Sequence, residues 1–357
     1  ILIPMACVVL FGTMLRNHAH ATVIYSVMMV FLVGLIAWGV CTDSLTPNPA
    51  LAGKAAVTDA GGKPYRVATT DAGGKPEAKE LAVPAVVGLP VDQSGYGNLE
   101  GQELRFGYSA TPTWSAITTC TSNGSVNGMH DSLNPLAGLT PLTGMWLNCN
   151  FGGIGVGLIN FLVYLVIAVF LAGLMVGRTP EYLGKKVEAR EMKLAAVALL
   201  VHPLLVLGPT GLFAALDWGA GATNNPGPHG FSEILYEFTS SSANNGSGFE
   251  GLGDTYGFND PKANPSTPAT YAPHYDVACG LVMVLGRFIP IIAPIAFAAS
   301  LAAKRPTPFT AGTLRTDTVT FGVLLFGTIV LLGALMFLPV AALGPIAEHL
   351  GPIPFGG

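Results

Sequence analysis

Six long runs of hydrophobic residues limit what this chain can fold into more than any other feature of its sequence. They cover residues 1–15, 22–41, 154–177, 194–216, 277–303 and 319–343. Apart from the shorter first run, each reaches the roughly 20 apolar residues that an α-helix needs to cross a bilayer. Half of all residues are hydrophobic and only 11% are charged, whereas soluble domains carry about 25% charged residues. The runs therefore predict an all-α polytopic membrane protein.

The positions of lysine and arginine predict how these helices are oriented. The basic residues of the connections are Arg16, then Arg178, Lys185, Lys186, Arg190 and Lys193, then Lys304, Arg305 and Arg315. Short loops rich in Lys and Arg stay on the cytoplasmic side, so residues 42–153 and 217–276 are expected outside. The net charge of −4 offers no basic patch. We therefore expect the lipid bilayer as a partner, and no nucleic acid.

Two similar polar segments lie in the regions expected outside. They are TTCTSNGSVNGMHDS, residues 118–132, and TSSSANNGSGFEGL, residues 239–252, and both contain Asn-Gly-Ser. Glycine can adopt positive φ, which lets successive backbone carbonyls point toward one axis, as in a cation filter. The same residue types are common in surface turns, and both triplets fit the N-glycosylation pattern. An exposed-turn interpretation therefore stays open beside the filter.

Each polar segment has the same flanking pattern. An apolar stretch too short to span precedes it, residues 106–118 in one case and 231–238 in the other, and a full hydrophobic run follows. Irregular backbone at membrane depth is tolerated only where it lines a water-filled path or is buried in protein. We therefore predict a repeated unit of helix, pore helix, filter and helix. Because the chain opens at Ile1 inside an apolar run, we expect a truncated start that follows earlier units.

The repeat predicts how the chain is divided. DAGG suits a tight hairpin, so the duplicated TDAGGKP, residues 58–64 and 70–76, is expected in a surface loop, and residues 253–274 are expected to cap the outer mouth. The expected segments are 1–41, which ends one unit and begins the next, 42–105 as an external loop, 106–177 with pore helix, filter and last helix, 178–193 as a cytoplasmic loop, 194–303 as the next unit with its filter, 304–318 as a cytoplasmic loop, and 319–357 as a last helix with an external tail.

The chemistry of the residues argues against an enzyme. No GxxxxGK[ST] loop is present, so we expect no bound nucleotide and no ATP hydrolysis by this chain itself. A membrane-embedded enzyme would need paired carboxylates or a nucleophile with a base, and neither pattern stands out. No side-chain metal site or disulfide framework is predicted, since the five cysteines are scattered and the histidines isolated: Cys7, Cys41, Cys120, Cys149, Cys279, His202, His229, His274 and His349.

Two charged residues near the polar segments are candidates for function. Asp131 lies near the end of the first segment, after its Asn-Gly-Ser, where its carboxylate could brace the turn or attract cations. Arg287 lies inside the fifth hydrophobic run, where a charge facing lipid costs at least a few kcal/mol. We therefore expect Arg287 to face the interior, either as a barrier to cations or as a partner that holds helices together.

Several longer motifs resemble the KdpA family, the potassium-binding, channel-like subunit of the bacterial Kdp potassium-uptake ATPase. The most specific is GLMVGRTPEYLGKKVEAREMK at 173–193. The opening ILIP also resembles the helix after that family's second filter. Further matches are NLEGQELRFG at 98–107, NPGPHGFSEILY at 225–236, SANNGSGF at 242–249, VLGRF at 284–288 and ALGPIAEHL at 342–350.

The resemblance implies four pseudo-symmetric units of helix, pore helix, filter and helix around one potassium pathway, as in the potassium channel and transporter superfamily. It implies uptake across the bacterial inner membrane, with ATP hydrolysed by a separate P-type catalytic subunit and small accessory membrane subunits completing the complex. A secondary potassium or sodium transporter, or a channel, of related architecture is the alternative. The family's acidic residue before FGG is replaced here by Asn148-Cys149-Asn150. By motif, the potassium ligands would be backbone carbonyls of Thr121, Ser122, Asn123, Gly124, Ser125, Asn244, Asn245, Gly246 and Ser247, and the charge barriers would be Arg287 and Arg178.

Overall fold

Five helices in the computed structural model are long and apolar enough to cross a membrane. The structure describes residues 1–46, 54–56, 66–70, 76–80, 82–84, 97–177, 179–225, 227–253, 274–308 and 314–351. The prediction of an all-α polytopic membrane protein is confirmed, and the shorter apolar helix α1 is Leu2–Leu15. The five spans are α2 His18–Gly39 with a π-helical turn Val40–Ser44, α6 Val156–Met175, α7 Ala189–Ala215, α10 His274–Ala302, and α11 Val319–Ala341 continued by η6 Ala342–Ile346 and α12 Ala347–Leu350.

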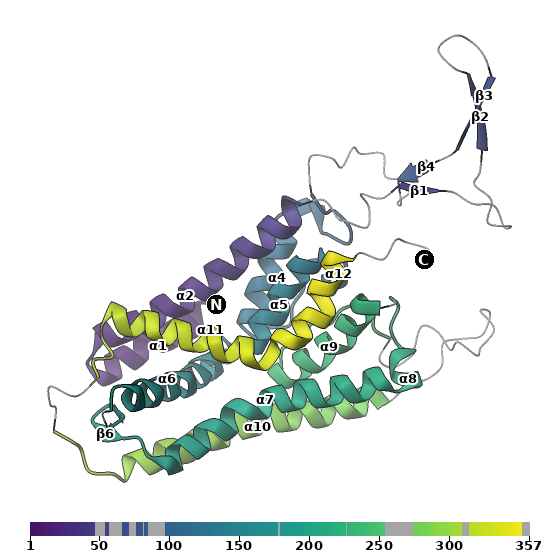
Figure 1. Cartoon of the computed structure of the whole chain (residues 1–357). Helices are drawn as coiled ribbons and strands as arrows, with labels where there is room; N and C mark the ends of the chain where they lie inside the picture. The colour runs from purple at the N-terminus through teal and green to yellow at the C-terminus, as the bar shows by residue number, and fades with distance from the viewer. Residues whose placement is uncertain are drawn as a thin grey trace.

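Short helices fill the half of the molecule away from strand β6 (Figure 1). Helix α4 matches the first expected pore helix, whereas α9, with 17 residues, extends well beyond the apolar stretch that suggested the second. The 13-residue α5 was not expected. Residues up to Leu350 continue the last span as helix, so part of the expected external tail is helical. These elements are η3 Leu104–Phe106, α4 Ala110–Cys120, η4 His130–Ser132, α5 Pro135–Leu147, η5 Gly153–Gly155, α8 Asp217–Ala220 and α9 Gly227–Ala243.

Within the described part of the chain, three small antiparallel strand pairs accompany the helices. The pair β2 Arg66–Thr70 and β3 Pro76–Glu80 flanks the second TDAGGKP copy, with Thr70 opposite Pro76, as expected of a hairpin. The first copy and residues 254–273 lie outside the described residues. The other pairs are β1 Lys54–Ala56 with β4 Ala82–Pro84, and β5 Glu181–Tyr182 with β6 Lys185–Lys186.

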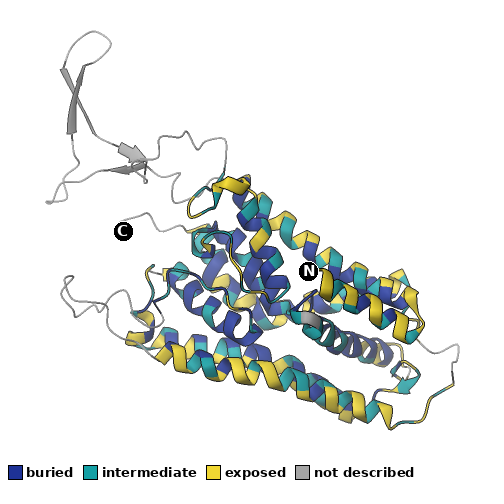
Figure 2. Ribbon diagram, turned by 180° about the vertical axis from the view of Figure 1, so that it is seen from behind, coloured by how far each residue is buried: buried dark blue, intermediate teal, exposed yellow. Residues whose placement is uncertain are grey.

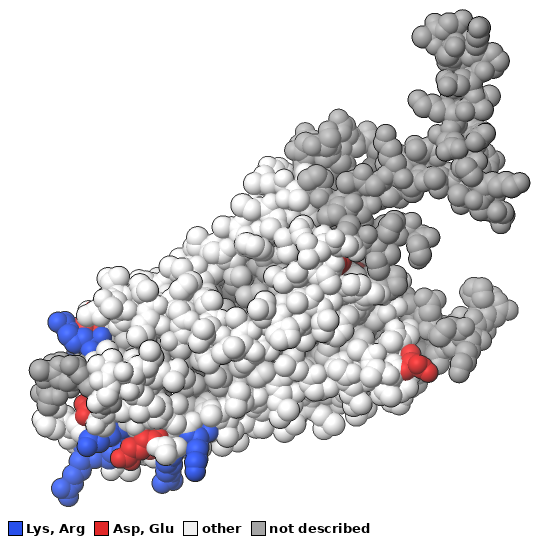
Figure 3. Space-filling view, in the orientation of Figure 1, with Lys and Arg blue, Asp and Glu red and all other residues white. Residues whose placement is uncertain are grey.

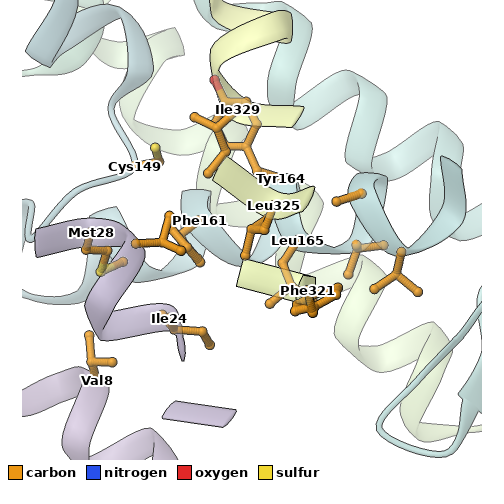
Figure 4. Close-up of a cluster of buried hydrophobic side chains, with 14 of the residues drawn as sticks. Val8, Ile24, Met28, Cys149, Phe161, Tyr164, Leu165, Phe321, Leu325 and Ile329 are labelled. Carbon is orange, nitrogen blue, oxygen red and sulfur yellow. The ribbon is translucent and has the colours of Figure 1, made fainter. Parts of the chain in front are cut away.

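The main hydrophobic core joins α1, α2, α6 and α11. Figure 4 shows side chains of this cluster, among them Ile24, Phe161 and Leu325, each fully buried. Helix α6 is the most enclosed span, with half of its most apolar stretch buried by the rest of the chain, against 17% in α10. Exposed residues accordingly follow the outer faces of the long helices, while buried residues face inward (Figure 2). This exposed apolar surface is what a bilayer or further protein would cover.

Helices α7 and α10 lie side by side (Figure 1) and are joined at the end that carries β6. Lys and Arg gather there, an end we call the basic end (Figure 3). The Nζ of Lys304, just beyond α10, lies 2.6 Å from Glu191 and 2.8 Å from Glu188 at the start of α7. Glu188 and Glu191 also form a capping box, in which each side chain accepts from the other's backbone. The orientation of this end in a membrane stays a prediction.

Candidate functional site

Residues 121–125, here called the first turn, and residues 244–247, the second turn, have the same backbone conformation at matching positions. Each follows directly after the C-terminal end of a short helix, α4 in the first case and α9 in the second. Ser122 and Asn244 have φ of 49° and 53°, and Gly124 and Gly246 have φ of 79° and 103°. Positive φ is uncommon outside glycine, so its recurrence at two matching positions is strong evidence of an internal structural repeat.

An internal hydrogen bond also recurs. The N–H of Ser125 donates to Oδ1 of Asn123 at 3.1 Å, and the N–H of Ser247 donates to Oδ1 of Asn245 at 3.0 Å. The surroundings differ, because Asn123 is exposed whereas Asn245 is 6% exposed. An exposed surface turn is therefore the wrong interpretation of the second triplet.

The turns touch each other. A Cβ added to Gly124 would lie 2.3 Å from the carbonyl oxygen of Asn245, a separation that real side chains do not adopt. The amide of Asn245 crosses over and donates to the carbonyl of Thr118 at 3.0 Å, at the end of α4. The chain thus brings together two segments that are far apart in sequence, and their close approach requires glycine at position 124.

Most of the backbone carbonyls expected to bind a cation are free of other partners. Those of Ser122, Asn123 and Gly124, and of residues 244–247, accept no hydrogen bond from any residue that the structure describes. Two others are engaged: the carbonyl of Thr121 accepts from the N–H of Gly153 at 2.9 Å, and that of Ser125 accepts from Nε1 of Trp114 at 3.1 Å. A carbonyl has a second lone pair, so these two can still coordinate a cation, with less freedom to reorient.

The segment before FGG packs directly against the first turn, which its sequence did not reveal. Oγ of Ser122 donates to Oδ1 of Asn148 at 3.4 Å, and Nδ2 of Asn160 donates to the Asn148 carbonyl at 2.8 Å. The position where the family resemblance implies a carboxylate therefore holds neutral amides in this chain. Any ion passing here meets amide dipoles rather than a fixed negative charge.

A cavity of about 30 Å³ opens beside both turns. Its polar lining comes from Asn148, Asn160, His202 and Ser242. Nε2 of His202 lies 3.0 Å from the Met145 carbonyl and Nδ1 lies 2.8 Å from Oγ of Ser242. Because a carbonyl only accepts, Nε2 carries the proton and Nδ1 accepts from the serine. The cavity has the volume for about two waters beside these polar groups, although most of its lining is apolar.

A cluster of ionisable groups joins the first turn to α9 and α12. The ring of His229 lies 2.8 Å from Asp131 and 2.7 Å from Glu348, and Glu233 is 4.0 Å away. Burial opposes the charged imidazolium, but the hydrogen bonds to Asp131 and Glu348 outweigh it and raise the pKa of His229 to about 10. Burial raises the pKa of Glu233 to about 7. Asp131 therefore holds the ring of His229 on α9, and its two expected roles at the turn stay predictions.

The same cluster bears on the expectation that no side-chain metal site would form, which stays a prediction. Ligand atoms of Asp131, His229 and Glu233 all lie within 4.8 Å of one another, so the geometry permits a metal ion. His229 and Glu233 are four residues apart on α9, whereas Asp131 comes from η4, and nothing in the sequence connects it with them. In this structure the imidazole of His229 is already hydrogen-bonded to Asp131 and Glu348 through both ring nitrogens.

The structure describes one of the two arginines expected as charge barriers, and the described residues do not enclose it. Arg287 is exposed on α10, a helix that the described residues cover only in small part, and its expected position facing the interior stays a prediction. Its neighbour Gly286 packs against the end of α9, just before the second turn. A Cβ at Gly286 would lie 2.5 Å from the Ser242 carbonyl oxygen. Arg178 lies outside the described residues.

Known proteins match this chain over nearly its whole length. The family model described as KdpA, Potassium-transporting ATPase A subunit, matches residues 1–350. The "Potassium-transporting ATPase potassium-binding subunit" of Geobacillus kaustophilus (strain HTA426) is 44% identical over 348 residues, 98% of this chain and 53% of that protein.

Proteins of the same name from two further species give similar values. That of Parabacteroides distasonis is 44% identical over 358 residues, 98% of this chain and 53% of the relative. That of Phocaeicola vulgatus is 52% identical over 262 residues, 71% of this chain and 43% of the relative. The chain spans about half the length of the curated relatives it matches. With its polytopic fold and its duplicated turns, the chain belongs to the KdpA family of potassium-transporting ATPase A subunits.

Proposed function

We propose that this chain forms part of a potassium-selective pathway in an ATP-driven uptake complex, with the two Asn-Gly-Ser turns as filter segments. The observation that carries the proposal is the direct contact between the turns, in which the Asn245 carbonyl lies against Gly124. Two copies of one backbone conformation that meet in space are what a filter built from repeated units requires. The names of the curated relatives, each a potassium-binding subunit of a potassium-transporting ATPase, support potassium as the substrate.

The electrostatics of the turns favour a cation. Helices α4 and α9 both end at the turns, so each directs the negative end of its dipole toward them. The unpartnered carbonyls of Ser122, Asn123 and Gly124, and of residues 244–247, supply oxygen ligands without a formal charge. A monovalent cation is stabilised by such dipoles without being trapped. In this proposal Thr121 and Ser125 mainly hold the backbone, through Gly153 and Trp114.

The remaining parts have roles that follow from this pathway. Residues 106–177 and 194–303 would each carry one pore helix, filter and outer helix, and the cavity lined by Asn148 and His202 would receive the ion after the turns. Arg287 and Arg178 would oppose free passage of cations. ATP would be hydrolysed by a separate P-type subunit of the complex, with small accessory subunits, in the bacterial inner membrane. The basic end would face the cytoplasm.

The test is ATP hydrolysis by the complete protein that contains this chain, purified with its ATPase partner, at increasing potassium concentration. Saturable stimulation by potassium, absent without the partner, is the expected result. Potassium flux that continues without ATP or partner would instead indicate a secondary transporter or channel. Sodium in place of potassium controls for ionic strength.

A further inference from the structure

A continuous chain of buried hydrogen bonds links the segment after the first turn to the second turn. Nδ1 of His130 lies 2.8 Å from the hydroxyl of Tyr236 on α9. That hydroxyl lies 2.8 Å from Oγ of Ser247, which lies 2.6 Å from Oδ1 of Asn245. The chain ends where Nδ2 of Asn245 donates to the Thr118 carbonyl at 3.0 Å. The hydrogen-bond chain therefore starts at His130, just beyond the first turn, and ends at Thr118, just before that turn.

The direction of each bond follows from which groups can donate. The amide of Asn245 donates through Nδ2 to a carbonyl, so its Oδ1 is the acceptor for Ser247. Having used its one proton, Ser247 Oγ accepts from Tyr236. The tyrosine oxygen then accepts from Nδ1–H of His130. Burial lowers the pKa of His130 to about 4, so the neutral ring carries its single proton on Nδ1.

Every member of the chain is shielded from solvent. His130 and Tyr236 are 0% exposed, and Thr118, Ser247 and Asn245 are 2%, 4% and 6% exposed. No link can exchange its partner for water, so losing one link leaves a buried donor or acceptor unpaired. The Thr118 carbonyl also accepts the N–H of Asn123 in the first turn, at 3.0 Å. One oxygen atom therefore anchors both turns.

We propose that His130, Tyr236 and Ser247 form a positioning relay that fixes the separation of the two turns and thereby sets discrimination among alkali cations. This inference rests on the proposed filter function of the turns. None of the three side chains needs to touch the ion. They hold the Asn245 side chain, whose backbone carbonyl faces Gly124. Loosening the relay would let the carbonyls adapt to a larger ion, because selectivity depends on how firmly the ligands are held.

The experiment measures half-stimulation of ATP hydrolysis by potassium and by rubidium in the complete complex, for wild type and Tyr236→Phe. The substitution removes one hydroxyl and keeps the ring. We expect the ratio of the two half-stimulation concentrations to change by roughly threefold to tenfold toward rubidium, in keeping with one lost buried hydrogen bond. Tyr275→Phe is the matched control, because that tyrosine is also fully buried and donates one hydrogen bond, to the Gly219 carbonyl at 2.9 Å, away from the turns.

Further variants separate failure of the relay from failure of the filter. Ser247→Ala should shift the ratio like Tyr236→Phe, and the double variant should shift it no further, because both break one chain. Ser247→Ala also tests the relay by itself if Tyr236→Phe does not fold. A wild-type ratio in both variants, while Gly246→Ala still alters the potassium response, would overturn the relay and leave the filter standing. If Gly246→Ala also leaves the potassium response unchanged, the filter assignment fails, and the relay with it.

Discussion

The carbonyl oxygen of Asn245 occupies the space that a side chain at Gly124 would need, 2.3 Å from the Cβ position. Gly124 also has φ of 79°, which costs other residues about 1–2 kcal/mol. We expect Gly124→Ala to move half-stimulation of ATP hydrolysis to at least roughly tenfold higher potassium, since about 1.4 kcal/mol is enough for that shift. Potassium titration of the complete complex measures it.

The control for that substitution is Gly107→Ala. Gly107 has φ of 90° and ψ of 155°, a region that disfavours other residues, but no atom lies within 4 Å of its Cβ position, so Ala there is strained without a clash and lies outside the turns. Its potassium response should match wild type. Equal effects of the two substitutions would mean that strain alone, and not contact between the turns, explains the result.

The imidazolium of His229 predicts a pH-dependent stability. The pKa is raised from 6.5 to about 10 in the folded protein, so the charged ring stabilises the fold fully below pH 6.5 and loses this contribution between pH 6.5 and about 10. His229→Gln should lower Tm by a few degrees at pH 6, with a difference that shrinks toward pH 10. Thermal unfolding of the complex across this range measures it. Asp131, Glu348, Glu233 and Glu100 surround the ring.

The matched substitution for this pH series is His18→Gln, at the exposed start of α2. It should leave Tm unchanged at every pH. A Tm difference for His229→Gln that stays constant from pH 6 to 10 would show that packing, and not charge, stabilises the cluster.

Removing Lys304 tests the joint between α7 and α10. Its Nζ lies 2.6 Å from Glu191, whose side chain is 0% exposed, so Lys304→Met leaves a buried carboxylate without its cation. We expect a loss of about 1–3 kcal/mol in the free energy of unfolding. Arg305→Met removes an exposed neighbouring charge and should change stability by less than about 0.5 kcal/mol. Denaturation of the purified complex compares the two, and similar losses would contradict the importance of the ion pair.

The two asparagines of the repeated triplet should differ in their sensitivity to substitution. Asn245 is buried and its side chain makes bonds to Thr118 and Ser247, whereas Asn123 is exposed and its side chain bonds only Ser125 among the described residues. Asn245→Ala should cost about 2–3 kcal/mol of stability, because it leaves buried groups unpaired, and Asn123→Ala about 1 kcal/mol or less. Thermal unfolding measures both, and equal losses would mean that the environment of the triplets matters little.

The length of the hydrophobic runs predicted the membrane spans well, because a run of about 20 apolar residues is typical of a transmembrane helix. The turns were predictable from glycine and its neighbours. The end of α9 was not: residues 239–242 are Thr and Ser and read as loop, yet they are helical and buried. Their polarity is satisfied locally, for example by Oγ of Ser240, which accepts from the N–H of Gly246 at 3.1 Å.

Contacts between distant segments lay beyond the sequence. Asp131, His229 and Glu348 come from three elements, and no spacing rule connects them. The exposure of Arg287 was also unpredictable, because the burial of a residue on α10 depends on which other elements cover that helix. Local pattern fixes the type of an element, whereas its partners depend on the packing of the whole bundle.

Helices α7 and α10 are fastened to each other at both ends. At the basic end, Lys304 forms an ion pair with Glu191 of α7. At the other end, the hydroxyl of Tyr275 on α10 donates a hydrogen bond to the Gly219 carbonyl, just after α7. Between these two points, Gly286 of α10 packs closely against Ser242, near the end of α9 and just before the second turn. A shift of either helix would therefore displace the other, and through Gly286 it would also displace the end of α9 that precedes the second turn.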